Sequence, residues 1–510
     1  MKRLPLEQKV APIREHRAGA IRAYFGTAKQ LLEEFKSGLL QPKDRACNNA
    51  WLCSSSVMAG PLRLATVSDG VVIMHSPMGC VSNLTQFLAP GMQPKTEIKQ
   101  DLGGFKPNQP ASWYCSNLTE EEVIFGGESK LRETLITVDR RHHPKSIWIF
   151  TSCVSGIMGD DIEGIVEETQ PEVEAIIVPV RCEAFQSRLC QWGHDAAGHA
   201  IMKYLVRKPR EKKKDMVNLI ASTMILVPDR LYLASLLGKV GIQTNTIPDY
   251  AVTESFQVLA EAAASVGICT TWSDYLGIAL EQEYGIPFIR DIVPFGIAQT
   301  EQWLRRIAQI CDKVEEMEVV IEEERARVMP KVKEYRERLQ GLRFFMNCGA
   351  TRTYHVPHML IDDFGMEMVG ITPFEFDETY IVPLENLLKL TGDKDFIVHV
   401  ADSQTLETVN YLKKLNLDLF LGHRGPQGFV FKQGIPGLHV GAPFPECHGL
   451  RQDKNYGMQM GFDGVISYGR YLSKVVSNPS FSENLAAHTK LPYKDSWYEE
   501  DPSVNLVDPM

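Results

Sequence analysis

The chain has 510 residues, too many for one ordinary hydrophobic core, so several domains are expected. Apolar residues make up 44% of the chain and charged residues 23%, as in globular proteins, which argues against a disordered or fibrous protein. The formal net charge of −10 argues against a nucleic-acid binder, which would carry a basic face.

Charges are scattered through residues 1–26 without a continuous apolar stretch. We therefore expect this segment to be neither a secretory signal nor a membrane anchor. No later stretch approaches the roughly 18 consecutive apolar residues of a membrane span. We therefore expect a cytoplasmic protein with neither a membrane nor a nucleic-acid partner.

Short β-branched runs recur along the chain, and each is followed by a Gly or polar turn and a helical stretch. Strands of this length alternating with helices are typical of parallel sheets covered on both faces. The sequence therefore predicts repeated, doubly wound α/β domains. The predicted strands are Gly70–Met74, Ser146–Phe150, Ala175–Val178, Val217–Ala221, Arg343–Met346, Asp395–His399 and Leu417–Leu421.

Two stretches interrupt this rhythm. One is the Lys- and Pro-rich segment at 207–215, and the other is a charged helix predicted from Cys311 to Leu339. Gly341 follows this helix and a new strand begins at Arg343, as expected where one domain ends and another begins. We predict domains over residues 1–210, 211–340 and 341–510.

The chain contains eleven cysteines, most of which are expected to be buried without a chemical role. In a cytoplasmic protein they are expected to be buried small side chains, metal ligands or nucleophiles rather than disulfides. Ligands of doubly wound sheets bind at the carboxyl ends of the strands. Three cysteines directly follow predicted strands there: Cys153, Cys182, and Cys348 with Gly349 after it.

Cys53, Cys80 and Cys153 lie too far apart in the sequence for a zinc finger, whose ligand pairs are separated by two to four residues. If they bind metal, they meet only in the folded chain. The glycine before Cys80, and Gly156 and Gly159 after Cys153, suit close approach of the backbone to a bulky group. The spacing alone leaves open that these cysteines are unrelated.

Six sequence blocks, in the same order, closely resemble those of the nitrogenase component 1 α-subunit. The resemblance runs from about residue 45 to about residue 475 and implies three Rossmann-like, doubly wound α/β domains. The blocks are His75-Ser-Pro-Met-Gly-Cys80, Ile124-Phe-Gly-Gly-Glu-Ser-Lys-Leu131, Cys153 with Gly159-Asp-Asp161, Val180-Arg-Cys-Glu183 with Gly193-His194, Cys269 with Tyr284-Gly-Ile-Pro287, and Gly461-Phe-Asp-Gly464.

In that family the first three cysteines bridge an iron–sulfur P-cluster (8Fe-7S) at the interface with a homologous β-subunit. The resemblance assigns Cys53, Cys80 and Cys153 as its ligands, since thiolates hold iron–sulfur clusters. The segment before Gly60 departs from the family pattern, so Cys47 is the alternative to Cys53. The resemblance also implies an α2β2 assembly and a separate ATP-dependent iron protein that supplies electrons.

Cys269 resembles the cysteine that holds one end of the family's active-site iron–sulfur–carbide cofactor (8Fe-9S-C type). A histidine shortly before the last block holds the other end. That segment is longer in this chain, so the histidine cannot be assigned by counting. We assign His448, which is nearer the block, over His439, with Cys447 as a third candidate.

Two further residues match cofactor contacts of the family. His194 stands where the family places a histidine beside the cofactor, and an imidazole can donate a hydrogen bond and relay protons. Arg352 follows Gly349 and matches an arginine that hydrogen-bonds cofactor sulfides. Its guanidinium is a permanently charged donor suited to an anionic cluster.

Two departures from the family bear on the reaction. Nitrogen-fixing α-subunits carry a lysine that anchors homocitrate, and the matching stretch, Gly425–Phe431, has Pro426 and no basic side chain. The segment Cys190–His194 is one residue shorter and contains Trp192, expected to reshape the pocket. Both favour a homocitrate-free, all-iron cofactor and the methylthio-alkane reductase branch, which cleaves small thioethers to methanethiol and a hydrocarbon.

Four alternatives remain open. A dinitrogen-fixing subunit shares the blocks, and tetrapyrrole reductases share the fold but are generally shorter and lack a cysteine like Cys269. A scaffold for cofactor maturation would keep Cys269 and often lacks the histidine ligand, so the assignment of His448 bears on it. A plain α/β interaction protein is disfavoured by the six ordered blocks.

Overall fold

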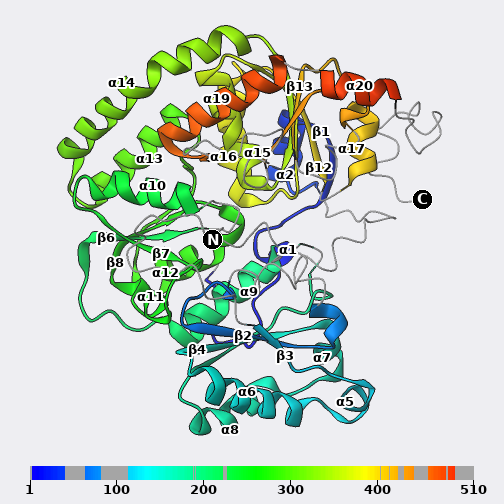
Figure 1. Ribbon diagram of the computed structural model, residues 1–510, viewed down its shortest axis with the longest axis vertical. Helices are drawn as coiled ribbons and strands as arrows, with labels where there is room; N and C mark the ends of the chain where they lie inside the picture. The colour runs from blue at the N-terminus through cyan, green and yellow to red at the C-terminus, as the bar shows by residue number, and fades with distance from the viewer. Residues whose placement is uncertain are drawn as a thin grey trace. The chain divides into compact units, whose positions relative to one another are not determined.

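The computed structural model describes residues 3–40, 64–81, 113–187, 189, 191–221, 227–401, 404–412, 414–422, 430–440, 458–477 and 480–488 (Figure 1). The chain divides into two compact units. Unit 1 comprises Met1–Arg14, Trp51–Thr223 and Thr244–Phe288, and unit 2 comprises Glu15–Ala50, Met224–Gln243 and Ile289–Met510.

The first sheet of unit 1 has four parallel strands in the order β3-β2-β4-β5. Side chains alternate between its two faces, as the period of a strand requires. On one face, the odd-numbered apolar residues of β2 and β4 pack against α6 (Glu128–His142) and α8 (Ile162–Thr169). The strands are β2 (Gly70–His75), β3 (Trp113–Cys115), β4 (Ser146–Thr151) and β5 (Ile176–Val180).

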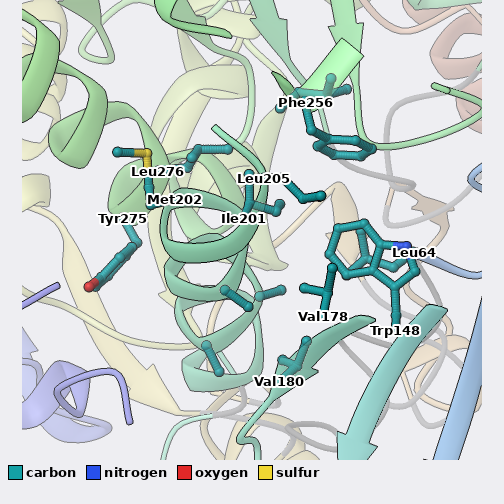
Figure 2. Close-up of a cluster of buried hydrophobic side chains, with 14 of the residues drawn as sticks. Leu64, Trp148, Val178, Val180, Ile201, Met202, Leu205, Phe256, Tyr275 and Leu276 are labelled. Atoms are coloured by element: carbon teal, nitrogen blue, oxygen red, sulfur yellow. The ribbon is translucent and has the colours of Figure 1, made fainter. Parts of the chain in front are cut away.

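The opposite face of this sheet carries the main core of unit 1 (Figure 2). Trp148 of β4 meets Phe256 edge to face, with ring centroids 5.5 Å apart. The π-helical turn η2 (Ile201–Leu205), which continues α9 (Trp192–Ala200), packs in the same cluster. Because α12 (Thr270–Tyr284) packs against α9, one apolar core fixes both helices to the sheet.

The second sheet has the order β7-β6-β8-β9, with β6 and β8 parallel. Its strands are β6 (Lys213–Ile220), β7 (Gln243–Ile247), β8 (Ala262–Gly267) and β9 (Phe288–Ile289). β6 begins four residues before the strand predicted at Val217, because its first three residues are exposed and polar and break the apolar pattern. α12 follows β8, so the chain leaves the carboxyl end of that strand through Cys269.

Unit 2 contains a six-stranded sheet in the order β1-β12-β11-β10-β13-β14. All its neighbours are parallel except the edge strand β1, which runs antiparallel to β12. The predicted strands at 343–346, 395–399 and 417–421 correspond to β10, β12 and β13. The strands are β1 (Ala23–Thr27), β10 (Arg343–Cys348), β11 (Glu367–Pro373), β12 (Ile397–Ala401), β13 (Leu419–Gly422) and β14 (Gly437–His439).

The long charged helix of unit 2 is α14 (Val314–Leu339). It begins three residues after Cys311, which ends α13 (Ile297–Ile310), and it ends just before Gly341, whose φ of +78° is readily adopted by glycine. Arg305 of α13 pairs with Glu318 of α14 through two hydrogen bonds of 2.6 and 2.9 Å. The side chains of Arg305 and Glu318 are both partly exposed, so this ion pair joins the two helices at the surface.

Other helical segments cover the sheets and connect the strands. They are α1 (Arg14–Arg17), α2 (Ala28–Lys36), α5 (Glu120–Phe125), α7 (Cys153–Met158), η1 (Gln170–Glu172), α10 (Val227–Gly238), α11 (Thr253–Gln257), η3 (Leu259–Glu261), α15 (Ala350–His358), η4 (Met359–Asp363), η5 (Glu378–Tyr380), α16 (Ile381–Leu390), α17 (Thr405–Leu412), α19 (Gly461–Ser477) and α20 (Ser480–His488).

The prediction of α/β architecture with parallel sheets is confirmed. The division into domains at 1–210, 211–340 and 341–510 stays a prediction. Among the residues described above, no helix is both long enough and apolar enough to cross a membrane.

Candidate functional site

Four cysteines lie at one edge of the first sheet. Because β3, β2, β4 and β5 are parallel, their carboxyl ends meet at the same edge. Each strand ends in or leads into a cysteine there: Cys115 ends β3, Cys80 follows β2, Cys153 begins α7 after β4, and Cys182 follows β5. The sequence predicted Cys80 and Cys153 as ligands and left Cys115 unassigned.

Burial separates these four thiols into two kinds. Cys80, Cys115 and Cys153 are partly exposed, whereas Cys182 is fully buried. Burial raises the pKa of Cys80, and the charges of Cys153 and Cys115 raise this pKa further. Burial raises the pKa of Cys182 well above its usual value, and its Sγ donates to the carbonyl of Thr151 at 3.3 Å. Cys182 is therefore a structural thiol.

The glycines beside these cysteines have different roles. A Cβ on Gly79, the residue before Cys80, would meet no atom of the described residues within 4 Å. A Cβ on Gly156 would lie 2.4 Å from the side chain of Glu183, so this glycine serves packing. Gly159 caps α7 with a φ of +80°. Close approach of the backbone to a bulky group stays a prediction at Gly79, while Gly156 and Gly159 have local roles in packing and in capping α7.

A buried hydrogen-bond network holds the loops around this edge. His75 Nε2 and Asp160 Oδ2 are 2.8 Å apart, and His75 Nδ1 and Ser116 Oγ are 2.9 Å apart. Asp160 Oδ1 also accepts from the backbone N–H of Gly127 at 3.1 Å. Although burial disfavours the charged carboxylate, the contacts with His75 and Gly127 hold the pKa of Asp160 below its usual value. The first three sequence blocks therefore meet through one polar network.

Cys269 stands at the carboxyl end of β8, where it precedes the first residue of α12. Its carbonyl accepts the backbone N–H groups of Trp272 and Ser273, at 3.0 and 2.8 Å, which fixes the first turn of the helix. The thiol is partly exposed. The ring of His194, in α9, meets Trp272 nearly perpendicularly at a centroid distance of 4.8 Å. The structure therefore brings His194 to the turn that begins at Cys269.

Trp192 has a structural role in unit 1. Its ring is fully buried in the core of unit 1, and Nε1 donates to the carbonyl of Ala11 at 3.3 Å. Two turns later, His199 Nε2 lies 2.9 Å from the carbonyl of Gln8 and donates to it. The indole therefore holds the N-terminal segment against α9, and its effect on the shape of a pocket beside His194 stays a prediction.

Arg352 lies in the first turn of α15, after Gly349 at the carboxyl end of β10. Its Nε and Nη2 donate to Gln459 Oε1 at 3.2 and 3.1 Å. The backbone N–H of Gln459 in turn donates to Asp229 at 2.7 Å. A Cβ on Gly349 would meet no atom within 4 Å in the part of the chain that the structure describes. Within unit 2, Arg352 is therefore buried and held against the segment that enters α19.

Several predicted residues lie outside the described residues, namely Cys47, Cys53, Cys190, Pro426, Cys447 and His448. His439 ends β14, at the edge of the sheet that contains Cys348. In the described part of the chain, no three His, Cys, Asp or Glu side chains are arranged to hold a single metal ion.

Cysteines at the carboxyl ends of parallel strands are compatible with a metal-cluster oxidoreductase, because ligands of such sheets bind there and thiolates hold iron–sulfur clusters. The family model of nitrogenase component 1 type oxidoreductases matches residues 56–477, and the chain belongs to this family. Proteins of this family bind P-clusters and iron–molybdenum-type clusters and form complexes with β-subunits and an iron protein.

Relatives of two kinds match with similar strength. The chain is 25% identical over 444 residues to the nitrogenase molybdenum-iron protein alpha chain of Methanothermobacter marburgensis, covering 86% of this chain and 88% of that one. It is 24% identical over 493 residues to the nitrogenase iron-molybdenum cofactor biosynthesis protein NifE of Methanococcus maripaludis, covering 93% and 94%. The solved structure of nitrogenase Cp1 at pH 6.5 has the same fold, with a TM-score of 0.70 at 20% identity over 89% of this chain and 94% of that chain.

Proposed function

We propose that this chain is the catalytic subunit of a nitrogenase-like reductase that cleaves the carbon–sulfur bond of methylthio-alkanes. The contact between His194 and Trp272, three residues after Cys269, is the observation that carries the proposal. In this contact an imidazole lies beside the first helical turn after Cys269, the predicted cofactor ligand, and both residues belong to unit 1. A cofactor ligand and a proton donor are the two groups that a reductive cleavage needs from the protein.

Cys80 and Cys153 would hold a P-cluster, together with Cys53 or its alternative Cys47. Thiolates on adjacent strand ends fit such a group. Three cysteines of one chain supply part of the ligand set, so a homologous β-subunit would complete it in an α2β2 assembly.

An exposed apolar patch near the carboxyl edge of the first sheet supports the proposal that a β-subunit binds there. Ile124 and Phe125 of α5 are 72% and 82% exposed, and Ile157 of the adjoining helix α7 is 77% exposed. Val123 and Met78 are also exposed. Large apolar side chains gathered on a surface usually mark an interaction site, and this patch carries Ile157 on the helix that begins at Cys153.

The active-site cofactor would be held by Cys269 at one end and by His448, or else His439 or Cys447, at the other. Arg352 would add a charged donor toward its sulfides, and Gly349 would leave room for it. We propose an iron–sulfur–carbide cluster without homocitrate, because the sequence Gly425–Phe431 contains no basic side chain to pair with its carboxylates.

Bound clusters would supply low-potential electrons, delivered one at a time from the ATP-dependent iron protein. A thioether CH₃–S–R takes up two electrons and two protons, the S–R bond breaks, and the products are CH₃SH and R–H. His194, which is 9% exposed, would donate a proton within a site largely closed to water.

A maturation scaffold is the second candidate, because the NifE relative matches 93% of the chain. A scaffold needs Cys269 to hold a nascent cluster but has no need of a proton donor beside it. His194 and Arg352 therefore favour the enzyme. A dinitrogen-reducing subunit would share both residues and differs from our proposal in its substrate.

The substrate assay tests this proposal directly. We expect the complex, given its iron protein and ATP, to release methanethiol from methylthio-alkanes much faster than it forms ammonia from dinitrogen. Both products are measured at equal electron flux, and a complex carrying Cys269→Ala serves as the blank. Efficient ammonia formation without methanethiol would contradict the thioether assignment, and absence of both activities in a cluster-loaded complex would favour the scaffold.

A further inference from the structure

We propose that Cys115 is an additional thiolate ligand of the iron–sulfur cluster at the carboxyl edge of the first sheet. The inference rests on the proposed P-cluster role of Cys80 and Cys153. Cys115 lies outside the six sequence blocks, so the family resemblance assigns it no role. Its position in the fold is what singles it out.

The sheet order places Cys115 beside the predicted ligands. β2 lies between β3 and β4, so Cys80, which follows β2, has Cys115 on one side and Cys153 on the other. In the parallel register of β2 and β3, Cys115 is opposite Met74, the penultimate residue of β2. All three cysteines are partly exposed. The edge therefore presents three partly exposed cysteines, one at the end of β3 and two in the segments that follow β2 and β4.

The surroundings of the Cys115 sulfur suit a thiolate. The backbone N–H of Asn117 donates to Sγ at 3.2 Å, and the hydroxyl of Ser76 lies 3.6 Å away. The protonated thiol donates to the carbonyl of Ser76 at 3.1 Å. Binding of iron would release this proton, and the N–H and hydroxyl donors would then stabilise the sulfur's negative charge. Hydrogen bonds of this kind tune the reduction potential of a cluster.

Cys182 shows that a position at this edge of the sheet does not by itself make a cysteine a candidate cluster ligand. It follows β5 at the same edge, yet it is fully buried in the apolar core and its Sγ bonds to the carbonyl of Thr151. Cys182 is fully buried, whereas Cys115 packs against the same core and is partly exposed. Cys182 is therefore the matched control.

The experiment compares Cys115→Ala, Cys115→Ser and Cys182→Ala in the anaerobic complex with the partner subunit. Iron content, the Mössbauer and electron paramagnetic resonance spectra of the P-cluster and its midpoint potential are measured. We expect Cys115→Ala to lose iron and change the spectra. Cys115→Ser should retain more iron but shift the potential, because a hydroxyl oxygen replaces sulfur. Cys182→Ala should match the unmodified complex in all three readouts.

Unchanged iron, spectra and potential in Cys115→Ala would overturn the inference. If that variant does not fold, the serine variant decides, and an unchanged potential there overturns the inference equally. Cys80→Ala and Cys153→Ala separate this failure from a failure of the proposed function. If they lose the P-cluster while Cys115→Ala keeps it, only the role of Cys115 is wrong. If all three keep it, the cluster assignment itself falls.

Discussion

Replacing Cys269 by Ala is expected to remove the active-site cofactor and lower substrate reduction by on the order of 100-fold or more, because even residues that only support a metal ligand can cost 10- to 100-fold. Cys269 ends the loop after β8, in the second sheet, whereas Cys80 and Cys153 follow strands of the first. The two clusters would therefore use separate ligands, and the P-cluster signals should remain. Iron analysis and electron paramagnetic resonance of the anaerobic complex measure both.

Cys311→Ala is the control for this substitution, because Cys311 is a buried cysteine at the end of α13 and has no predicted ligand role. Among His439, Cys447 and His448, only one replacement by Ala should reproduce the loss of cofactor. Full activity of His448→Ala would move the assignment to one of the other two. A complete cofactor in Cys269→Ala would contradict the assignment of this end of the site.

Cys153→Ala is expected to lose the P-cluster and with it electron delivery to the active site. Cys153 is the first residue of α7, whose start is fixed by the hydrogen bond from the backbone N–H of Ser155 to Ser152 Oγ. Alanine is compatible with this helix, so the effect should come from the missing thiolate. The purified complex should have a lower iron content, no P-cluster spectrum and little ATP-dependent substrate reduction. We also expect weaker association with the partner subunit, which shares the cluster.

Cys182→Ala again provides the matched comparison, since it removes a thiol at the same sheet edge that is buried in the core. It should leave iron content and reduction rates unchanged. A normal P-cluster spectrum in Cys153→Ala would show that this cysteine is not a ligand, whatever the behaviour of Cys269.

The parallel sheets could be predicted because their strands are short, apolar and separated by helices. The predicted strands at 70–74 and 146–150 correspond to β2 and β4, both completely buried. Gly341 could be predicted as a helix stop because glycine readily adopts a positive φ, and its φ is +78°. The sequence blocks could be placed at strand ends because the ligand-binding loops of parallel sheets follow the carboxyl ends of the strands.

Other features depend on contacts between distant residues. β3 has three residues, Trp113–Cys115, too few for a recognisable pattern, so Cys115 was not predicted as part of the edge. The sequence signal for this strand was the pair Trp113 and Tyr114, because aromatic residues favour strands. Similarly, the hydrogen bond from Trp192 to Ala11 joins residues far apart in the sequence, and no local pattern indicates which way an indole points.

The strand β1 illustrates the same limit for the fold. Residues Ala23–Thr27 pair with β12 of the sheet in unit 2, across more than half of the chain. Pairing of this kind is set by which edge a strand can reach, and strand propensity carries no information about it.

Anaerobic iron, sulfide and heterometal analysis of the chain, purified alone and with its partner subunit, tests the central claim most directly. We predict about 16 iron atoms per αβ pair, from one P-cluster and one active-site cluster of eight iron atoms each, with no stoichiometric molybdenum or vanadium. The chain alone should be unstable or poor in iron. A full iron complement in the isolated chain, or a complex that contains stoichiometric molybdenum, would contradict the account.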